Sequence, residues 1–412
     1  MAHAVVVGGG IVGLAIAHRL LDCGVSVSLV DAPSREPSAS WGNAGHIAIE
    51  QVAPLASSAT ICDAPRRLFS AHGGLSLPIG SVGAWAPFSL RLMLAARRSR
   101  YIAGKSALSA LLAQATPAWE RLVQSLEKPQ LLRRDGHFIT WSTAKSAAAG
   151  RRHWLSADVG SASIRDTHAD ELRELRALVT KRIVGAVRCS GSGQIYDPDE
   201  LLQAMRRRFT GGGGAFIPAH IAHLRAEAGK ARVYADDGQM LAADFLVVAG
   251  GIGSRSLLEG VGHRVPMIAE RGYHVQFRAE NWPADMPPVV FEDRAMIATR
   301  FSSVVRVAGF VEFCDAERPA DERKWQRLEQ NIKELDLPLD HRVGNWMGSR
   351  PTLPDYLPAI GKSRRARNLF YAFGHQHLGL TLAPITGEIM AALVTDRTPA
   401  VSISPFDLER FL

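Results

Sequence analysis

The sequence contains little cysteine and lacks long apolar runs. Its four cysteines are widely spaced and form no C-x-x-C pair, a pattern that predicts neither a disulfide framework nor a metal site. No stretch approaches the about 20 apolar residues of a membrane span. The apolar run 4–17 has no basic segment before it and is interrupted by glycines, unlike a signal peptide. We therefore expect a cytoplasmic protein.

Acidic residues are fewer than basic ones. The 48 lysines and arginines outnumber the 40 aspartates and glutamates, which gives a net charge of +8. Such an excess can serve a nucleic acid, an anionic membrane or an acidic substrate. The basic clusters 206–208 and 364–367 are short, and the sequence has no zinc-finger or RNP-type pattern. A scattered basic surface is favoured, and we expect no nucleic-acid partner.

The first 31 residues carry the clearest motif. A β-branched strand pattern is followed by glycines at G-x-G-x-x-G spacing, by a helical pattern and by a second strand that ends in Asp31. Gly8 makes the tight turn, Gly10 lets the backbone approach a pyrophosphate, and Gly13 allows close packing of helix and strand. The helix start attracts phosphate, and Asp31 is placed to accept hydrogen bonds from a ribose. The motif predicts a dinucleotide site of Rossmann type.

Two later segments repeat the order strand, glycine-rich turn, helix. A buried-type strand at 245–249 runs into the turn 250–254, and a strand at 369–373 runs into the turn and helix 374–394. Each turn directs backbone N–H groups toward an acceptor. Because a chain of 412 residues is too long for one ordinary core, we expect a nucleotide domain assembled from distant segments and a second domain inserted between them.

The intervening sequence predicts a second domain rich in strands. An Asp-Gly dipeptide within 131–141 predicts a β-hairpin. We also expect a strand at 216–224 and two strands within 295–313. The proline-containing segment 346–361 is expected to be irregular.

The segment 91–112 combines basic residues with apolar residues at helical spacing. Such a stretch is usually a solvated helix face, and it can also rest on an anionic lipid surface. The solvated face is favoured. Peripheral contact with the inner face of the cell membrane is kept as the alternative.

Taken together, these segments resemble the D-amino-acid oxidase superfamily of FAD-dependent amine and amino-acid oxidoreductases. The resemblance rests on the N-terminal G-x-G-x-x-G and on the segments 43–45, 247–253, 348–355 and 374–387. Within the superfamily, the chain is most similar to bacterial D-amino-acid dehydrogenases. The tripeptide 271–273 and the histidine-containing part of 374–387 resemble members that oxidise cyclic D-imino acids such as cis-4-hydroxy-D-proline.

The resemblance implies an α/β fold, α+β overall, in which a Rossmann-type FAD-binding domain is interleaved with a substrate domain built on a mixed, largely antiparallel sheet. We expect the FAD-binding domain to comprise residues 1–84, 185–262 and 340–412, and the substrate domain to comprise 85–184 and 263–339. The cysteine that attaches flavin in some sarcosine oxidases is not evident, so FAD is expected to be noncovalently bound.

The three turns and the resemblance together assign residues to the cofactor. The expected FAD-binding residues are Gly8, Gly10, Ile11, Val12, Gly13, Asp31, Ala32, Ser40, Asn43, Ala44, Gly45, Gly250, Gly251, Gly348, Gly374, Gly379, Leu380 and Thr381. Reduced flavin carries negative charge at its pyrimidine end, and the backbone of 379–381 at a helix N-terminus is placed to stabilise it.

Four residues are candidates for contact with the substrate. In the family, the arginine of the G-x-R-P segment pairs with the substrate carboxylate, which points to Arg350; a salt bridge with Asp355 is the structural alternative. His377 stands where related oxidases can have arginine, and it either binds the carboxylate or contacts a substrate hydroxyl. His46 either deprotonates the amine, hydrogen-bonds the substrate or serves structure alone. Tyr273 either closes the pocket or packs in the core.

The expected activity is FAD-dependent dehydrogenation of a D-amino acid or cyclic D-imino acid at Cα, by hydride transfer to flavin N5, giving an imine and then a 2-oxo acid. A quinone or respiratory carrier is the expected electron acceptor. The alternatives are an oxidase of a secondary amine such as sarcosine, glycine or an opine, and a flavoprotein subunit of a larger electron-transfer complex. An NAD-linked enzyme shares the first motif but does not explain the C-terminal segments.

Overall fold

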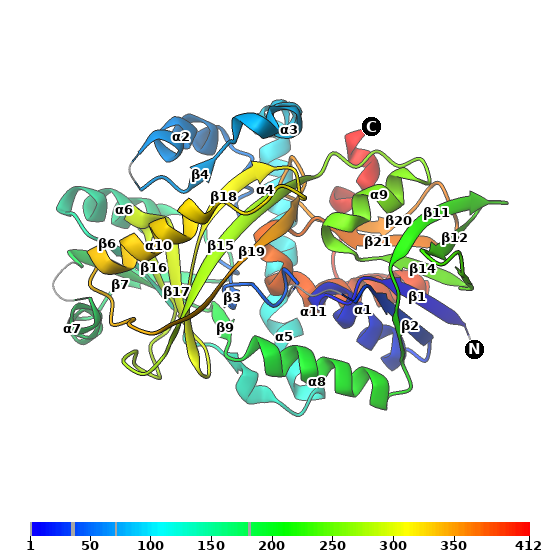
Figure 1. Ribbon diagram of the computed structural model, residues 1–412, viewed down its shortest axis with the longest axis horizontal. Coiled ribbons are helices and arrows are strands. Elements are labelled where there is room, and N and C mark those ends of the chain that lie inside the picture. Colours follow the sequence, from blue (N-terminus) through cyan, green and yellow to red (C-terminus); the bar gives the residue numbers. More distant parts are fainter. Residues whose placement is uncertain (1, 34–37, 71, 180–182) are drawn as a thin grey trace.

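Two large β-sheets organise the molecule, one at each end of its long axis (Figure 1). The computed structural model describes residues 2–33, 38–70, 72–179 and 183–412. Within these residues one sheet has six strands and the other has nine, and two sheets of three strands complete the β-structure.

The six-stranded sheet is the expected Rossmann-type sheet. In spatial order its strands are β10 (Ala215–Pro218), β2 (Ser26–Asp31), β1 (His3–Val7), β14 (Phe245–Val248), β21 (Leu369–Phe373) and β20 (Ala359–Lys362). The first five run parallel to one another, and β20 is antiparallel to β21. Both faces are covered, which explains why the strand sequences are apolar throughout rather than alternating.

The nine-stranded sheet is mixed and largely antiparallel, as expected. In spatial order its strands are β19 (Arg342–Thr352), β15 (Ile268–Arg278), β18 (Val304–Cys314), β17 (Met296–Arg300), β16 (Val289–Phe291), β6 (His137–Trp141), β8 (Gly185–Ser190) and β7 (Ser163–Asp166), with β4 (Leu75–Ser76) beside β18. The pairs β16–β6 and β18–β4 are parallel.

The small sheets and the helices fill the space around the large sheets. One small sheet holds β11 (Ile221–Glu227), β12 (Lys230–Ala235) and β13 (Met240–Leu241); the other holds β3 (His46–Ile47), β9 (Gly193–Ile195) and β5 (Leu132–Arg133). The helices are α1 (Ile11–Asp22), α2 (Ser58–Phe69), α3 (Val82–Ala95), α4 (Arg98–Leu112), α5 (Ala115–Ser125), α6 (Ala144–Ser156), α7 (Ala169–Leu178), α8 (Pro198–Gly211), α9 (Ser254–Glu259), α10 (Glu322–Glu334) and α11 (Gly379–Val394).

Helices α1 and α11 pack together at the centre of the main core. A Cβ added at Gly387 of α11 would lie 2.6 Å from the carbonyl oxygen of Ala15 in α1, so the two backbones are in direct contact. By length and composition the stretch Gln376–Val394 could cross a membrane, but 72% of it is buried inside the molecule. It therefore has the burial of a core helix.

Three expectations about local structure are wrong. The strands within 131–141 do not form a hairpin, because β5 pairs with β9 while β6 pairs with β8 and β16. The expected strand 216–224 is divided between β10 and β11, which belong to different sheets. The segment expected to be irregular begins inside β19, which tolerates Pro351 because an edge strand has backbone N–H positions without a partner.

The expected domain boundaries also differ from the packing in places. β8 and β19 lie in the nine-stranded sheet, although the ranges 185–262 and 340–412 assign them to the FAD-binding domain. In the other direction, α4 and α5 of the range 85–184 pack against α11 in the main core, because Leu108, Leu111 and Trp119 present a buried apolar face to it.

Candidate functional site

The three glycine-rich turns meet at one edge of the six-stranded sheet. β1, β14 and β21 are adjacent and parallel, so the turns that follow them leave from the same edge. A Cβ added at Gly8 would lie 2.4 Å from the carbonyl oxygen of Ala249, which shows how tightly the first two turns pack. The structure thus confirms that these distant segments converge.

The first turn has the contacts that a pyrophosphate loop needs. A Cβ at Gly13 would lie 1.8 Å from the carbonyl oxygen of Gly8, so α1 packs directly against the turn. The carboxylate of Asp31 lies over Gly9, since a Cβ there would be 2.6 Å from Oδ2. The hydroxyl of Ser40 accepts a hydrogen bond of 2.9 Å from the N–H of Ile11. The predicted cofactor residues of this region therefore surround the start of one helix.

The third turn leads into α11 through a short 3₁₀ helix, η5 (Gln376–Leu378). Gly374 has a φ of +77°, which glycine adopts without strain. The N-terminus of α11 has no side-chain cap, so the backbone N–H groups at 379–381 keep their donor capacity. Thr381 accepts a hydrogen bond of 3.0 Å from Ala48, which fastens the loop after β3 to this helix.

The loop that carries Asn43, Ala44 and Gly45 is fixed to the nine-stranded sheet. Arg306 of β18 donates hydrogen bonds to the carbonyl oxygens of Trp41, at 2.7 Å, and Asn43. His274 of β15 lies 3.1 Å from the carbonyl oxygen of Gly42. Burial lowers the pKa of Arg306 to about 10 and that of His274 to about 2. His274 is therefore neutral, and the buried cation of Arg306 holds the loop 41–43 against the nine-stranded sheet.

Arg350 lies on β19, directly across from Glu270 of β15. Its Nη1 donates to Glu270 Oε1 at 3.3 Å and to the carbonyl oxygen of Phe310 at 3.2 Å. A Cβ at Gly272 would be 2.1 Å from Nη2, so the guanidinium lies over this glycine. The side chain of Arg350 is 27% exposed and that of Glu270 1%. The partly exposed guanidinium thus rests on a buried carboxylate.

The structural alternative for Arg350, a salt bridge with Asp355, is wrong about the partner. Asp355 pairs with Arg410 at 2.7 Å, not with Arg350. Glu270 is held by hydrogen bonds from Thr352, at 3.1 Å, and Tyr356, at 3.0 Å. Both hydrogen bonds that Arg350 makes to described residues leave from Nη1, so the Nη2 side of the planar fork is available to a ligand.

His377 lies close enough to Arg350 and His46 for the charges of both to affect its pKa. Its Nε2 hydrogen-bonds Gln51. Burial lowers the pKa of His377 to about 4; the charges of Glu270 and Glu50 oppose this shift, and those of Arg350 and His46 add to it. His377 is therefore a neutral polar group at neutral pH. Arg350, His46 and His377, three of the four predicted substrate residues, are thus close enough to interact electrostatically.

His46 does not stand alone. Its Nε2 lies 3.2 Å from Oε1 of Glu50. Burial alone would raise the pKa of Glu50, but the nearby His46 and His137 lower it to about 2. Burial lowers the pKa of His137 to about 3, and its Nδ1 lies 2.9 Å from the Ser192 hydroxyl. The sequence pattern did not identify Glu50 or His137, because only the fold brings residue 137 to this loop.

Tyr273 is the one substrate candidate that the structure places elsewhere. It is 1% exposed, and its hydroxyl donates to Glu312 at 2.7 Å. Its ring packs against Trp325 of α10. Alternate residues of a strand point to opposite faces, and Tyr273 faces the helix-covered side of β15 whereas Gly272 faces Arg350. The packing alternative is the one that the structure supports.

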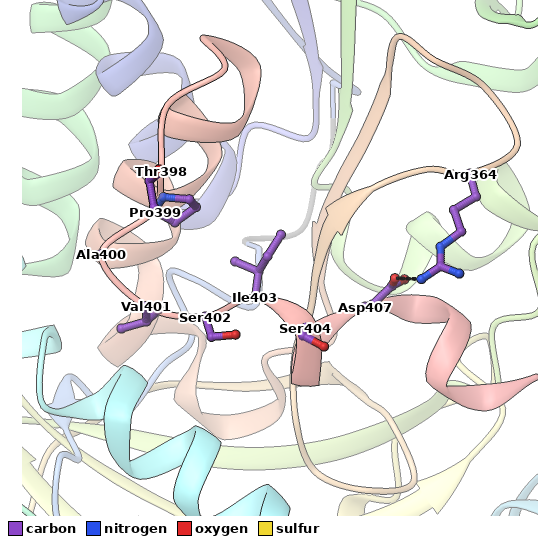
Figure 2. A pocket seen from close by; sticks show the side chains of 9 residues that line it. All are labelled: Arg364, Thr398, Pro399, Ala400, Val401, Ser402, Ile403, Ser404 and Asp407. Carbon is purple, nitrogen blue, oxygen red and sulfur yellow. Dashed lines mark hydrogen bonds and ion pairs between the residues drawn. The ribbon is translucent and has the colours of Figure 1, made fainter.

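A separate hollow lies near the C-terminus, as Figure 2 shows. It is lined by residues 398–404 together with the ion pair of Arg364 and Asp407, which are 2.8 Å apart. None of the predicted cofactor or substrate residues lines it. The turns and Arg350 therefore remain the candidate active site.

The comparison with protein families decides the class of this site. The model of the FAD-dependent oxidoreductase family matches residues 3–393. The chain belongs to this family. In sequence it is 28% identical to a D-amino-acid oxidase of Bradyrhizobium diazoefficiens, covering 100% of this chain and 99% of that protein. It is 26% identical to D-amino acid dehydrogenase 2 of Ralstonia nicotianae, covering 98% of this chain and 99% of that one.

Solved structures of similar proteins confirm the fold of this FAD-dependent oxidoreductase. A glycine oxidase from Geobacillus kaustophilus superposes with a TM-score of 0.75 over 100% of both chains, at 20% identity. The L-proline dehydrogenase of P. horikoshii gives a TM-score of 0.74, covering 100% of this chain and 97% of that one, at 15% identity. The expected fold class is therefore confirmed.

The residues present fit FAD, the cofactor of the family. The glycine turn before α1 lets backbone approach a pyrophosphate, and Asp31 at the end of β2 is placed for the ribose. The uncapped start of α11 supplies backbone donors at the same sheet edge. Gly250, Gly251 and Gly348 remain predicted contacts; a Cβ at Gly348 would be 2.0 Å from the ring of Trp346, which covers it.

Proposed function

We propose that this enzyme oxidises a D-amino acid or a cyclic D-imino acid, including substrates of the cis-4-hydroxy-D-proline type. The observation that carries the proposal is the partly exposed guanidinium of Arg350, held over Gly272 by a buried carboxylate. A fixed guanidinium binds a carboxylate through two N–H groups and so sets its orientation. The names of the relatives, a D-amino-acid oxidase and a D-amino acid dehydrogenase, support the same substrate class.

In the proposed reaction the protein mainly positions the substrate. Arg350 binds the carboxylate through its free edge, while Glu270 and the Phe310 carbonyl keep Nη1 in place. Neutral His377 contacts either the carboxylate or a ring hydroxyl of the substrate. FAD, when bound, supplies the hydride acceptor. Holding the Cα–H bond at a fixed distance and angle is the main contribution to rate that these residues make.

Anaerobic reduction of the bound flavin tests this function. The purified protein should contain FAD whose absorbance bleaches with at least one D-amino or cyclic D-imino acid and not with its L-enantiomer. Bleaching by sarcosine, glycine or an opine alone would favour the secondary-amine alternative, for which a structural neighbour named iminodiacetate oxidase gives a precedent. Failure of every amine would favour an electron-transfer subunit. A protein that cannot take up FAD would refute the whole proposal.

The variant Arg350→Lys tests the role of the guanidinium. Because a point charge replaces a planar fork, we expect a loss of about 2–4 kcal/mol in transition-state stabilisation, measured as kcat/KM. Arg342→Lys, at the other end of β19, is the matched control, since Arg342 pairs with Glu329 at 2.6 Å away from the site. A loss below about fivefold in Arg350→Lys would reject the carboxylate role.

We further propose that the enzyme works on the inner face of the cell membrane and passes electrons to a quinone or respiratory carrier. The support is a surface formed by α2, α3 and the start of α4, which lie along one edge of the molecule (Figure 1). These helices and the 3₁₀ helix Ile79–Ser81 carry large apolar side chains that are exposed: Phe69, Ile79, Val82, Leu90, Met93, Leu94 and Ile102. Apolar side chains bordered by cations suit an anionic lipid surface.

Three basic residues of this surface have positive charges that no carboxylate of the described residues neutralises. Arg97, Arg98 and Arg100 are exposed, and no carboxylate of the described residues forms an ion pair with them. The double variant Arg98→Glu/Arg100→Glu should abolish sedimentation with phosphatidylcholine vesicles that contain about one third phosphatidylglycerol. The double variant Lys145→Glu/Arg152→Glu on α6, two exposed positions, is the charge-matched control. Equal sedimentation of both variants, or none of the wild type, would refute membrane association.

A further inference from the structure

Three potential metal ligands meet beside the candidate active site. His46 begins β3, Glu50 follows in the next loop, and His137 begins β6. One ligand atom from each lies within 4.8 Å of the other two. His46 Nε2 and Glu50 Oε1 are 3.2 Å apart, close to the about 3.3 Å that separates two ligands on a tetrahedral ion with bonds of about 2.0 Å.

The surroundings hold these side chains in place. The side chains of His46 and Glu50 are 10% and 1% exposed, and His137 is 2% exposed. His46 is fixed by the pairing of β3 with β9, where it lies opposite Gln194. The hydroxyl of Ser192 engages Nδ1 of His137 and leaves its Nε2 for another partner. A hydrogen bond to the far nitrogen is the usual support of a metal-bound histidine.

The cluster has no lysine or arginine partner among the described residues and contains unpaired polar atoms. No lysine or arginine of the described residues forms an ion pair with Glu50; its one ion-pair partner there is His46. Among the described side chains, His46 Nδ1 and Glu50 Oε2 are buried without a hydrogen-bond partner. A buried carboxylate is costly unless it is paired with a cation or coordinates a metal. The buried carboxylate of Glu50, with its Oε2 unpaired and only histidines beside it, points to a bound cation.

We infer that His46, Glu50 and His137 bind one divalent transition-metal ion, for which Zn²⁺ is the best match. Two imidazoles and one carboxylate form a donor set that favours zinc over the oxygen-preferring Mg²⁺ and Ca²⁺. Three protein ligands leave a fourth position for water. This gives His46 a role other than the three considered from the sequence, which were deprotonation of the amine, a hydrogen bond to the substrate and structure alone.

The proposed ion would connect the loop after β3 to the nine-stranded sheet, beside the candidate active site. His46 and Glu50 belong to the loop that Thr381 fastens to α11, whereas His137 belongs to the nine-stranded sheet. Gln51, next to Glu50, hydrogen-bonds His377. An ion at the cluster would therefore fix the loop that orients His377. The inference concerns metal binding and does not depend on the proposed substrate.

Metal analysis of the FAD-loaded enzyme tests the inference. After incubation with ZnCl₂ and gel filtration, elemental analysis should find about one zinc per wild-type chain, and MgCl₂ should give none. Glu50→Gln and His137→Ala should each retain less than about a tenth of that zinc. Ser192→Ala, which removes only the support of His137, should weaken zinc affinity about 10-fold or more.

Two measurements keep the result interpretable. The flavin absorbance of each variant reports whether the fold is retained. His220 is an exposed histidine between β10 and β11, away from the cluster, and His220→Ala should retain full zinc. Zinc should also raise the Tm of the wild type and not that of Glu50→Gln. Wild-type protein with intact flavin absorbance and no retained zinc would overturn the inference. So would zinc that persists in both Glu50→Gln and His137→Ala.

Discussion

Gly272 offers a way to displace Arg350 without changing its charge. In Gly272→Ala the new Cβ would lie 2.1 Å from Nη2 and 2.6 Å from Cζ of Arg350. The contacted atoms are the far end of a flexible side chain, and Gly272 is not among the glycines with positive φ, so alanine can adopt its backbone conformation and the fold should survive. The guanidinium must leave its place over β15, which removes about one charge-assisted hydrogen bond to a substrate carboxylate. Such a bond contributes about 1.5–3 kcal/mol, so kcat/KM should fall about 10- to 150-fold.

Stopped-flow reduction of the flavin, with the substrate found in the panel, measures this effect directly. Gly344→Ala in β19 is the matched control, because a Cβ at Gly344 meets nothing within 4 Å. The Tm of both variants should stay close to that of the wild type. If Gly272→Ala loses less than about threefold in kcat/KM while Arg350→Lys loses far more, the position assigned to the guanidinium is wrong.

Three further outcomes follow from the packing. Gly13→Ala puts a Cβ 1.8 Å from the Gly8 carbonyl oxygen; α1 must move, and the purified protein should have lost most of its flavin absorbance, so full retention would contradict the phosphate role. Gly387→Ala puts a Cβ 2.6 Å from the Ala15 carbonyl oxygen; overpacking of about 1–3 kcal/mol should lower the Tm in calorimetry, and an unchanged Tm would contradict it. Burial lowers the pKa of His375 to about 3 from 6.5. The unfolded chain then binds the proton more readily, so the free energy of unfolding should fall as pH drops below 6.5, by about 1.4 kcal/mol per pH unit from this group. Urea unfolding at several pH values, with His375→Gln expected to lessen the slope, measures it.

The parts of the site that follow from local sequence were predictable. The glycine spacing before α1 and the acid that ends β2 lie within one continuous segment, and the structure places Gly8, Gly13 and Asp31 around a single turn. Parallel strands carry their following turns to one edge, so the convergence of three turns also followed from the repeated order of strand, turn and helix.

The parts that depend on long-range pairing were not predictable. Glu270 meets Arg350 only because β15 and β19 pair in one register, and a shift of one residue would turn Tyr273 toward the site instead. Long-range pairing also explains why the predicted hairpin around Asp135 does not form. β5 pairs with β9 and β6 pairs with β8, both far along the chain, instead of with each other. Glu50 and His137 are brought together by the fold in the same way.

The late position of β21 in the chain has a consequence for biosynthesis. β14 pairs with β1 on one side and on the other with β21, a strand that ends at residue 373, and the helix after β21 ends at residue 394. A ribosome must therefore synthesise the chain beyond residue 373 before the third turn exists. Nascent chains and C-terminal truncations should emerge as apoprotein, and supply of the vitamin-derived cofactor should determine how much newly made enzyme escapes proteolysis.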